Sequence, residues 1–197
     1  LFSEEGKLID SVLHPYDTNI YNNTWAEQNP EDWWKAVCQS SKKLLAKQSG
    51  SDIACIVFSG QMMGCLCIDK QGKPLHPSII HCDLRAEKEC QQILSTIDAK
   101  EFYTITGHVA SSAYSLEKLM WIKSNKPEIY AKTWKMLCAK DYINYRLTGI
   151  IATDYSDASG TNAFDLTNWQ WSEKIIKASG IDGNLLPEVK ASTDVLG

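Results

Sequence analysis

The sequence lacks several features that would point directly to a class of protein. No apolar run approaches the roughly 18 residues that a membrane-spanning helix needs. No run of basic residues is longer than two and the formal net charge is -4, so binding to nucleic acid phosphates is not expected. We find no internal repeat, no low-complexity tract and nothing that reads as a secretory signal. These absences favour a cytoplasmic protein that binds neither membranes nor nucleic acids.

Cysteine is present seven times, but never in a metal-binding pattern. No two cysteines form a Cys-x-x-Cys pair, and no second set of Cys or His stands at the spacing that zinc needs. Cys65 and Cys67 lie two apart in an apolar run, so they would share one face of a strand. We therefore expect buried, free thiols, as in a reducing compartment.

What is present is the composition of a globular protein. With 197 residues, 44% of them hydrophobic and 22% charged, the chain can bury a substantial core as one domain. Asn29 and Pro30 predict a helix start, because Asn caps helices and Pro suits the first turn. Residues 52–59 form a continuous apolar run rich in β-branched side chains, which predicts a strand buried on both faces of a central sheet.

The second half of the chain is predicted to be mainly helical. Residues 154–165 are the exception, because their small and polar side chains indicate a structured loop. Their three aspartates lack the spacing of a calcium-binding loop, so turns fixed by Asx hydrogen bonds explain them better. Helical spacing or helix-ending glycines predict helices at 86–97, 115–125, 127–135, 141–147 and 171–179.

Several short motifs follow one another in an order that resembles one known family. They are Trp25 to Trp34, Ser59 to Gly64, Asp69 to Arg85, Lys118 to Trp121, Lys140 to Gly149, Asp154 to Asp165 and Leu186 to Val189. In this order they are similar to the FGGY carbohydrate kinases, with xylulose kinases as the most similar members. A single such motif is weak support, but motifs in register over nearly the whole chain are strong support.

This resemblance implies an α/β fold. The expected domain is ribonuclease-H-like, the fold of actin-like ATPases, with a central mixed sheet and flanking helices. Residues 1–197 would be the N-terminal, sugar-binding half of a two-domain kinase, without the family's first strand hairpin and without its C-terminal domain. The implied reaction moves the γ-phosphate of ATP, with Mg²⁺ on the nucleotide, to a sugar hydroxyl. The segments that bind the nucleotide and the catalytic base are expected before Leu1 and after Gly197, so no residue of the chain is assigned as that base.

Five residues are candidates for binding the sugar. Gln61, Met62 and Met63 follow the predicted buried strand, and ligands of α/β proteins usually bind where strands end. His81 and Asp83 follow the next apolar run. Each has a plainer interpretation: the two methionines as core residues, His81 as a satisfied polar residue, and Asp83 as a partner of Arg85 or a helix cap.

Met63 limits the choice of substrate. Xylulose kinases usually place His at this point of the motif, and a thioether cannot donate a hydrogen bond. A pentulose such as xylulose stays the favoured substrate, with gluconate, a polyol or another linear sugar as alternatives. A second hypothesis is a sugar-binding or regulatory module without catalysis. The expected partners are the small carbohydrate, ATP and the C-terminal domain, and a homodimer is left open.

Three more positions are weaker candidates. Tyr114 and Ser115 could line the sugar pocket, and Trp25 could stack on a sugar ring, whereas the other tryptophans are expected to pack in the core. Lys118 is expected to be structural and to pair with an acidic residue elsewhere.

Overall fold

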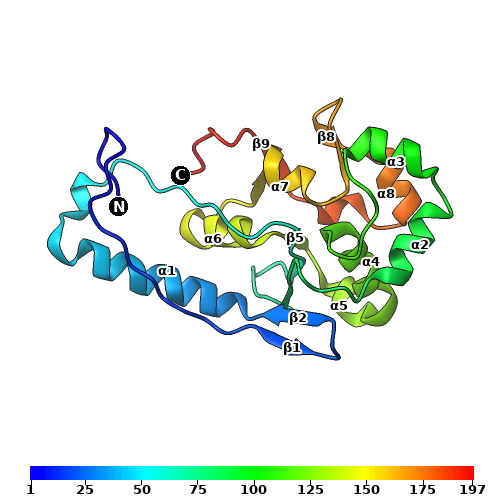
Figure 1. Ribbon diagram of the computed structural model, residues 1–197, viewed down its shortest axis with the longest axis horizontal. Helices are drawn as coiled ribbons and strands as arrows, with labels where there is room; N and C mark the ends of the chain where they lie inside the picture. Colours follow the sequence, from blue (N-terminus) through cyan, green and yellow to red (C-terminus); the bar gives the residue numbers. More distant parts are fainter.

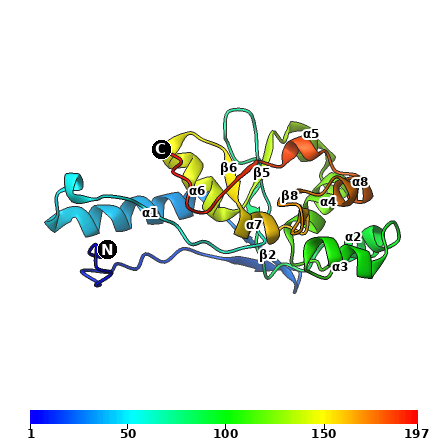
Figure 2. The same ribbon diagram turned by 90° about the horizontal axis from the view of Figure 1, so that it is seen from above.

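The structure, a computed structural model, describes residues 1–197 as a mixture of short helices and strands (Figure 1). The helices gather at one end, around α2, α3, α4 and α8, while α1 extends toward the other end. Both chain termini lie in the half that contains α1, also when the molecule is turned by 90° (Figure 2). The helices are α1 (Pro30–Leu44), α2 (Glu87–Leu94), α3 (Ala99–Thr106), α4 (Ser115–Asn125), α5 (Pro127–Lys132), α6 (Ala139–Thr148), α7 (Tyr155–Ser159) and α8 (Glu173–Ser179).

Helix boundaries follow the capping residues in the sequence. Asn29 caps α1 as predicted, with its side-chain oxygen accepting a hydrogen bond from the Glu31 backbone N–H. Helices α6 and α8 end at Gly149 and Gly180, which adopt left-handed backbone angles that suit glycine. Helices were also predicted at the positions of α2, α4 and α5. The short helix α7 interrupts the stretch that was expected to be a loop throughout, and α3 was not predicted.

The strands form four small sheets in place of the single central mixed sheet that was expected. The sheets have the orders β1-β2-β4, β3-β5, β6-β9 and β7-β8, and only the pair β6-β9 is parallel. The strands are β1 (Asn19–Tyr21), β2 (Trp25–Gln28), β3 (Leu66–Ile68), β4 (Ser78–Ile79), β5 (Lys135–Leu137), β6 (Ala152–Asp154), β7 (Phe164–Asp165), β8 (Gln170–Trp171) and β9 (Glu188–Lys190).

The strand predicted at residues 52–59 is absent. From Ile53 onward this segment has no regular structure, and the side chains of Ile56 and Val57 are 64% and 83% exposed. The physical reason is that residues 54–59 form no backbone hydrogen bond with another segment, so no ladder is completed. Its composition suits a strand, but composition alone supplies no pairing partner.

Strand β3 divides the hydrophobic core into two clusters. Cys65, just before it, and Cys67 point into the larger cluster, while Leu66 and Ile68 point into the smaller one. The prediction that Cys65 and Cys67 share a face is therefore confirmed. All seven cysteines are free, but Cys55 and Cys82 are exposed, so the expectation that all thiols are buried is wrong for these two. None of the helices has the length and apolar character that crossing a bilayer demands.

Candidate functional site

The turn from Gln61 to Gly64 lies beside the end of β4. Cys65 donates its backbone N–H to the Ile79 carbonyl at 2.9 Å, and Ile79 returns a hydrogen bond to Cys65 at 3.2 Å. Because this bridge is antiparallel, the residues before Cys65 and those after Ile79 lie next to each other. The structure thereby brings the Gln61–Met63 turn and His81 together, although 20 positions separate Gln61 from His81.

A chain of polar side chains fixes the orientation of Gln61. Its carbonyl Oε1 lies 3.3 Å from Nδ1 of His81, and its amide Nε2 donates to Oε1 of Gln28 at 2.6 Å. The same Gln28 oxygen accepts the indole N–H of Trp33 at 2.9 Å, and the Gln28 amide donates to Thr18 at 2.8 Å. Both amides are therefore held in one orientation, and the exposed imidazole of His81 stands at the open end of the chain.

Met62 and Met63 form the tip of this turn. Met63 has a backbone φ of 61°, in the left-handed region that side chains other than glycine rarely adopt. Such strain persists only where surrounding contacts impose it, and it concentrates at binding sites. Met62 is 42% exposed, and its terminal methyl reaches Gly160 just after α7. The turn is thus held against α7 and still accessible to a ligand.

Lys118 of α4 forms a hydrogen bond with the backbone of the turn. Its side chain is fully buried, and its ammonium donates to the carbonyl of Met63 at 2.7 Å and to the carbonyl of Ala113. Burial lowers the pKa of Lys118 to about 8. The expected acidic partner is absent, because backbone carbonyls satisfy this ammonium.

Asp83 is buried, and other groups of the protein occupy its carboxylate. Its carboxylate is fully buried and accepts hydrogen bonds from the backbone of Ala26 at 2.5 Å and from Arg85, whose guanidinium donates to both oxygens at 2.7–3.0 Å. Arg85 also pairs with Glu27 at 2.8 Å. The structure therefore contains the Arg85 pairing, which was the alternative interpretation, and leaves no oxygen of Asp83 directed at a sugar.

Trp25 is engaged by the same arginine. The Arg85 guanidinium carbon lies 4.1 Å from the centre of the Trp25 ring, and Trp121 meets that ring edge-on at 5.2 Å. These contacts pack against the ion pair between Glu27 of β2 and Arg85, which precedes α2, and they make Trp25 part of the packing around Arg85.

A small cavity adjoins Gln61. It has a volume of about 140 Å³ and opens between α1, α6 and the segment that precedes the turn. Its lining is mainly apolar, and its polar residues include Ser59, Gln61 and Lys140. A larger hollow of about 430 Å³ lies over α6 and is lined by none of the five candidate residues. We take the smaller cavity as part of the site, because it contains a candidate residue.

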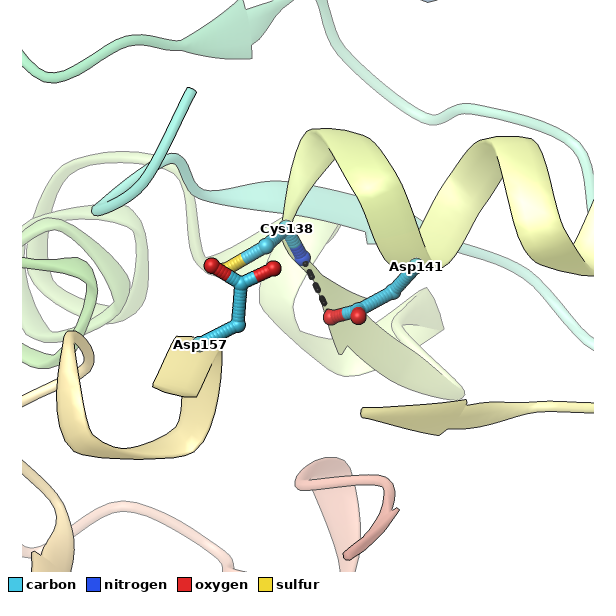
Figure 3. A group of neighbouring side chains, drawn as sticks. All are labelled: Cys138, Asp141 and Asp157. Atoms are coloured by element: carbon cyan, nitrogen blue, oxygen red, sulfur yellow. Dashed lines mark hydrogen bonds between the residues drawn. The ribbon is translucent and has the colours of Figure 1, made fainter. Parts of the chain in front are cut away.

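Cys138, Asp141 and Asp157 are the one group of side chains close enough together to hold a metal ion, with ligand atoms within 4.8 Å of one another (Figure 3). Their chemistry does not fit Mg²⁺, which prefers oxygen ligands and retained water, because one donor is a thiol. The Lys140 ammonium already lies 3.2 Å from Asp157 and 2.8 Å from Asp154. Burial raises the pKa values of Cys138, Asp141 and Asp157. This cluster is therefore not suited to hold Mg²⁺.

The loop around the three aspartates is fixed as predicted. Asp154 accepts a hydrogen bond from the backbone N–H of Asp157 at 3.0 Å, and Asp165 accepts one from Thr167 at 2.8 Å. The interpretation as an Asx-type turn is confirmed for Asp165, whereas Asp154 caps α7 and Asp157 pairs with Lys140.

Sequence reasoning missed a second polar group near the turn. Nδ1 of His108 lies 3.3 Å from the Tyr114 hydroxyl, and Nε2 lies 3.3 Å from the Ser159 hydroxyl. These side chains are partly exposed, and Ser159 precedes the Gly160 that Met62 contacts. Tyr114 had been a weak candidate, but no local pattern connects His108 to Ser159, which lies 51 positions away. Ser115 is fully buried.

The chain resembles known proteins over its whole length. The whole chain, residues 1–197, matches the model of the FGGY family of carbohydrate kinases, N-terminal domain. The chain belongs to this family. Structurally, it superposes on FGGY kinases over its full length, so its mixed α/β fold is that of the N-terminal part of a longer kinase.

Two curated FGGY relatives and one solved structure illustrate the likeness. The chain is 36% identical to a xylulose kinase from Lactococcus lactis over 100% of the chain and 40% of the relative. It is 30% identical to a gluconokinase from Bacillus subtilis over 99% of the chain and 38% of the relative. The structure of a ligand-bound xylulose kinase from Lactobacillus acidophilus has a TM-score of 0.92 at 28% identity, covering 100% of this chain and 40% of that one. The chain thus spans about two fifths of the length of its relatives.

Proposed function

We propose that the protein carrying this chain transfers the γ-phosphate of ATP to a hydroxyl of a small carbohydrate, and that this chain holds the sugar. The observation that carries the proposal is the meeting of the Gln61–Met63 turn with His81 in a chain that matches the FGGY N-terminal domain from end to end. Xylulose is the substrate we favour, because several relatives of the chain are xylulose kinases.

The geometry supports a binding role for these residues. Sugar hydroxyls need hydrogen-bonding groups held in fixed positions, and the amide of Gln61 and the imidazole of His81 supply donors and acceptors that the Gln28 chain orients. Phosphoryl transfer depends mainly on positioning and on electrostatic stabilisation. We infer that ATP with Mg²⁺, and the catalytic base, are held mainly by parts of the protein outside this chain.

The proposed enzyme has two domains that close over the sugar and exclude water, which limits wasteful hydrolysis of ATP. In this arrangement residues 1–197 are the sugar-binding domain, and residues 53–59 join a continuous central sheet. We place the enzyme in the cytoplasm and leave a homodimer open.

Two alternatives follow from particular observations. Met63 lacks the donor that a histidine would supply, and a gluconokinase is among the relatives, so gluconate or another linear sugar is the second candidate substrate. A sugar-binding module without catalysis is the second candidate function. The coding sequence after Gly197 distinguishes these functions, since a kinase needs a segment there that carries the base.

The test is ATP consumption by the chain expressed with its flanking coding sequence. D-xylulose, L-xylulose, ribulose, gluconate and glycerol are offered in turn, and the 197-residue chain alone is the control. We expect turnover that depends on D-xylulose, only in the longer protein, with a phosphorylated sugar detected by mass spectrometry. Turnover with gluconate alone would mean that gluconate, and not xylulose, is the substrate. A folded longer protein without turnover on any sugar would favour the binding module.

A further inference from the structure

Lys118 is a buried ammonium group without a carboxylate partner. Lysine is rarely fully buried, and a buried charge is usually paired with an opposite charge. Here the side chain has no exposed surface, and the hydrogen bonds of Nζ go to the backbone carbonyls of Met63 and Ala113. These carbonyls belong to segments that meet through no strand pairing. The ammonium is therefore the direct polar link between them.

The two linked segments both lie near the Met62–Met63 tip. One segment is the turn itself, where Met63 adopts its left-handed backbone. The other segment leads from Ala113 into Tyr114, whose hydroxyl lies within hydrogen-bonding distance of His108. Because Met63 lies in an unfavourable conformation, its carbonyl needs an external partner to keep its direction. Lys118 supplies that partner and thereby sets the distance between the Met63 turn and the Ala113 segment.

The surroundings of Lys118 keep the contact direct. Four titratable groups lie near enough to influence its charge: Asp83, Cys65 just before β3, Cys138 at the start of α6, and Glu117, which precedes it on α4. Asp83 is already paired with Arg85, and Glu117 accepts hydrogen bonds from Asn162 and from the backbone N–H of Ser111. Burial raises the pKa of the Cys138 thiol, which favours its neutral form. The ammonium therefore bonds to the two carbonyls and to no carboxylate.

We propose that Lys118 is a positioning residue of the sugar site, whose ammonium holds the Met63 turn and the Ala113 segment at the separation that binds the sugar. The inference rests on the proposed kinase function and deepens it. Lys118 itself does not touch the sugar, because it is completely buried. Loss of the link leaves the turn free to relax, so sugar binding must first order it again, and the affinity for sugar falls.

The charge of Lys118 gives the proposal a second signature. Because burial lowers its pKa to about 8, the ammonium is present below that pH and becomes a neutral amine above it. A neutral amine donates weaker hydrogen bonds than an ammonium. The KM for sugar therefore rises as the pH increases through about 8, while the guanidinium of a Lys118→Arg variant stays charged over this range.

The experiment uses the chain expressed with its flanking coding sequence, and measures KM for D-xylulose, KM for ATP and kcat from pH 6.5 to 9.5. We expect Lys118→Met to raise the KM for sugar at least about tenfold at pH 7, with the KM for ATP within about twofold of the unaltered protein. Lys118→Arg is expected to restore part of the affinity and to remove the alkaline rise. Lys123→Met is the matched control, because Lys123 lies on the same helix and also donates to a carbonyl, that of Gly180, but is exposed.

Each outcome decides a separate point. An unchanged KM for sugar in a folded Lys118→Met variant overturns the inference, and so does an equal rise with Lys123→Met. If Lys118→Met does not fold, the comparison of the unaltered protein with Lys118→Arg decides, and the same alkaline rise in both overturns the inference. No turnover of any sugar by the unaltered protein removes the proposed function itself, and the inference with it.

Discussion

At the scale of single residues, Met63 combines a left-handed backbone with a side chain that cannot donate a hydrogen bond. Histidine is found more often at positive φ and supplies a donor. Met63→His should therefore lower the KM for D-xylulose by about 2- to 10-fold, which corresponds to one hydrogen bond. Steady-state kinetics check this, with Met63→Leu as a control of similar size. If the leucine variant improves the KM equally, hydrogen bonding is not the cause.

Glu117 is a residue at which stability should depend on pH. It is fully buried, its Oε1 accepts a hydrogen bond from Asn162 at 3.0 Å, and its Oε2 has no partner. Burial raises the pKa of Glu117 to about 7. A carboxyl whose pKa is higher in the folded state binds its proton more tightly when folded. The stability that it contributes is therefore complete below the unfolded pKa of about 4.3 and is lost as the pH rises through about 7.

Glu117→Gln should remove this dependence on pH. The amide keeps an acceptor for Asn162 and carries no charge, so about 3 kcal/mol of the decline in unfolding free energy between pH 4 and pH 8 should disappear. Urea unfolding across this range measures the effect, and Glu87→Gln at an exposed position of α2 is the control. Parallel curves for the unaltered protein and Glu117→Gln would show that Glu117 is already ionised when buried.

Candidate residues of the site could be identified from the sequence, but most of their contacts could not. The turn at Gln61–Met63 and His81 could be found as candidates because they follow apolar runs and carry family motifs. Asp83 stands in the same pattern, but its role depends on Arg85, which turns inward to meet it. Lys118 was recognised as structural, yet its carbonyl partners lie in other segments, and a backbone carbonyl leaves no signature in a sequence.

At the scale of secondary-structure elements, local sequence signals predicted the helices better than the strands. Caps and helix-ending glycines act over a few residues, so α1, α6 and α8 could be placed from sequence. A strand needs a partner that is distant in sequence, and residues 53–59 show that composition cannot supply one. Helix α3 went unpredicted, although Asp98 caps it and Gly107 ends it, because its apolar pattern is short.

The turn after β3 offers a test of packing between elements. Gly72 has a φ of 76°, and a Cβ atom there would overlap the hydroxyl of Tyr145 on α6. Gly149 has a similar φ of 74° with open space around it. Alanine at either position carries the cost of a left-handed backbone, about 1–2 kcal/mol. Gly72→Ala should cost at least about 1 kcal/mol more, because Tyr145 must move.

Chemical denaturation of the two alanine variants measures this difference. Since both glycines share the backbone conformation, the excess loss at Gly72 reports the contact between the turn and α6. Equal losses would mean that the Tyr145 ring swings away without cost, and that the turn and α6 are not tightly coupled.

At the scale of the whole molecule, the two clusters of the core lie on the two faces of the β3-β5 pair, and residues 53–59 form no strand. A soluble domain rarely leaves a continuous β-branched run exposed, since it offers open backbone groups to any other strand. In the proposed two-domain enzyme this run joins a central sheet. The chain alone and the longer protein should therefore differ most at this segment.

Hydrogen exchange measures that difference. In the 197-residue chain the amides of residues 54–59 should exchange rapidly, because they donate to no backbone acceptor. In the chain expressed with its flanking coding sequence, pairing should slow them at least about 100-fold. Amides of β3 are the internal control, because that strand is buried and paired in either case. Rapid exchange at residues 54–59 in both proteins would mean that this run stays outside any sheet, and the central sheet would then have to form without it.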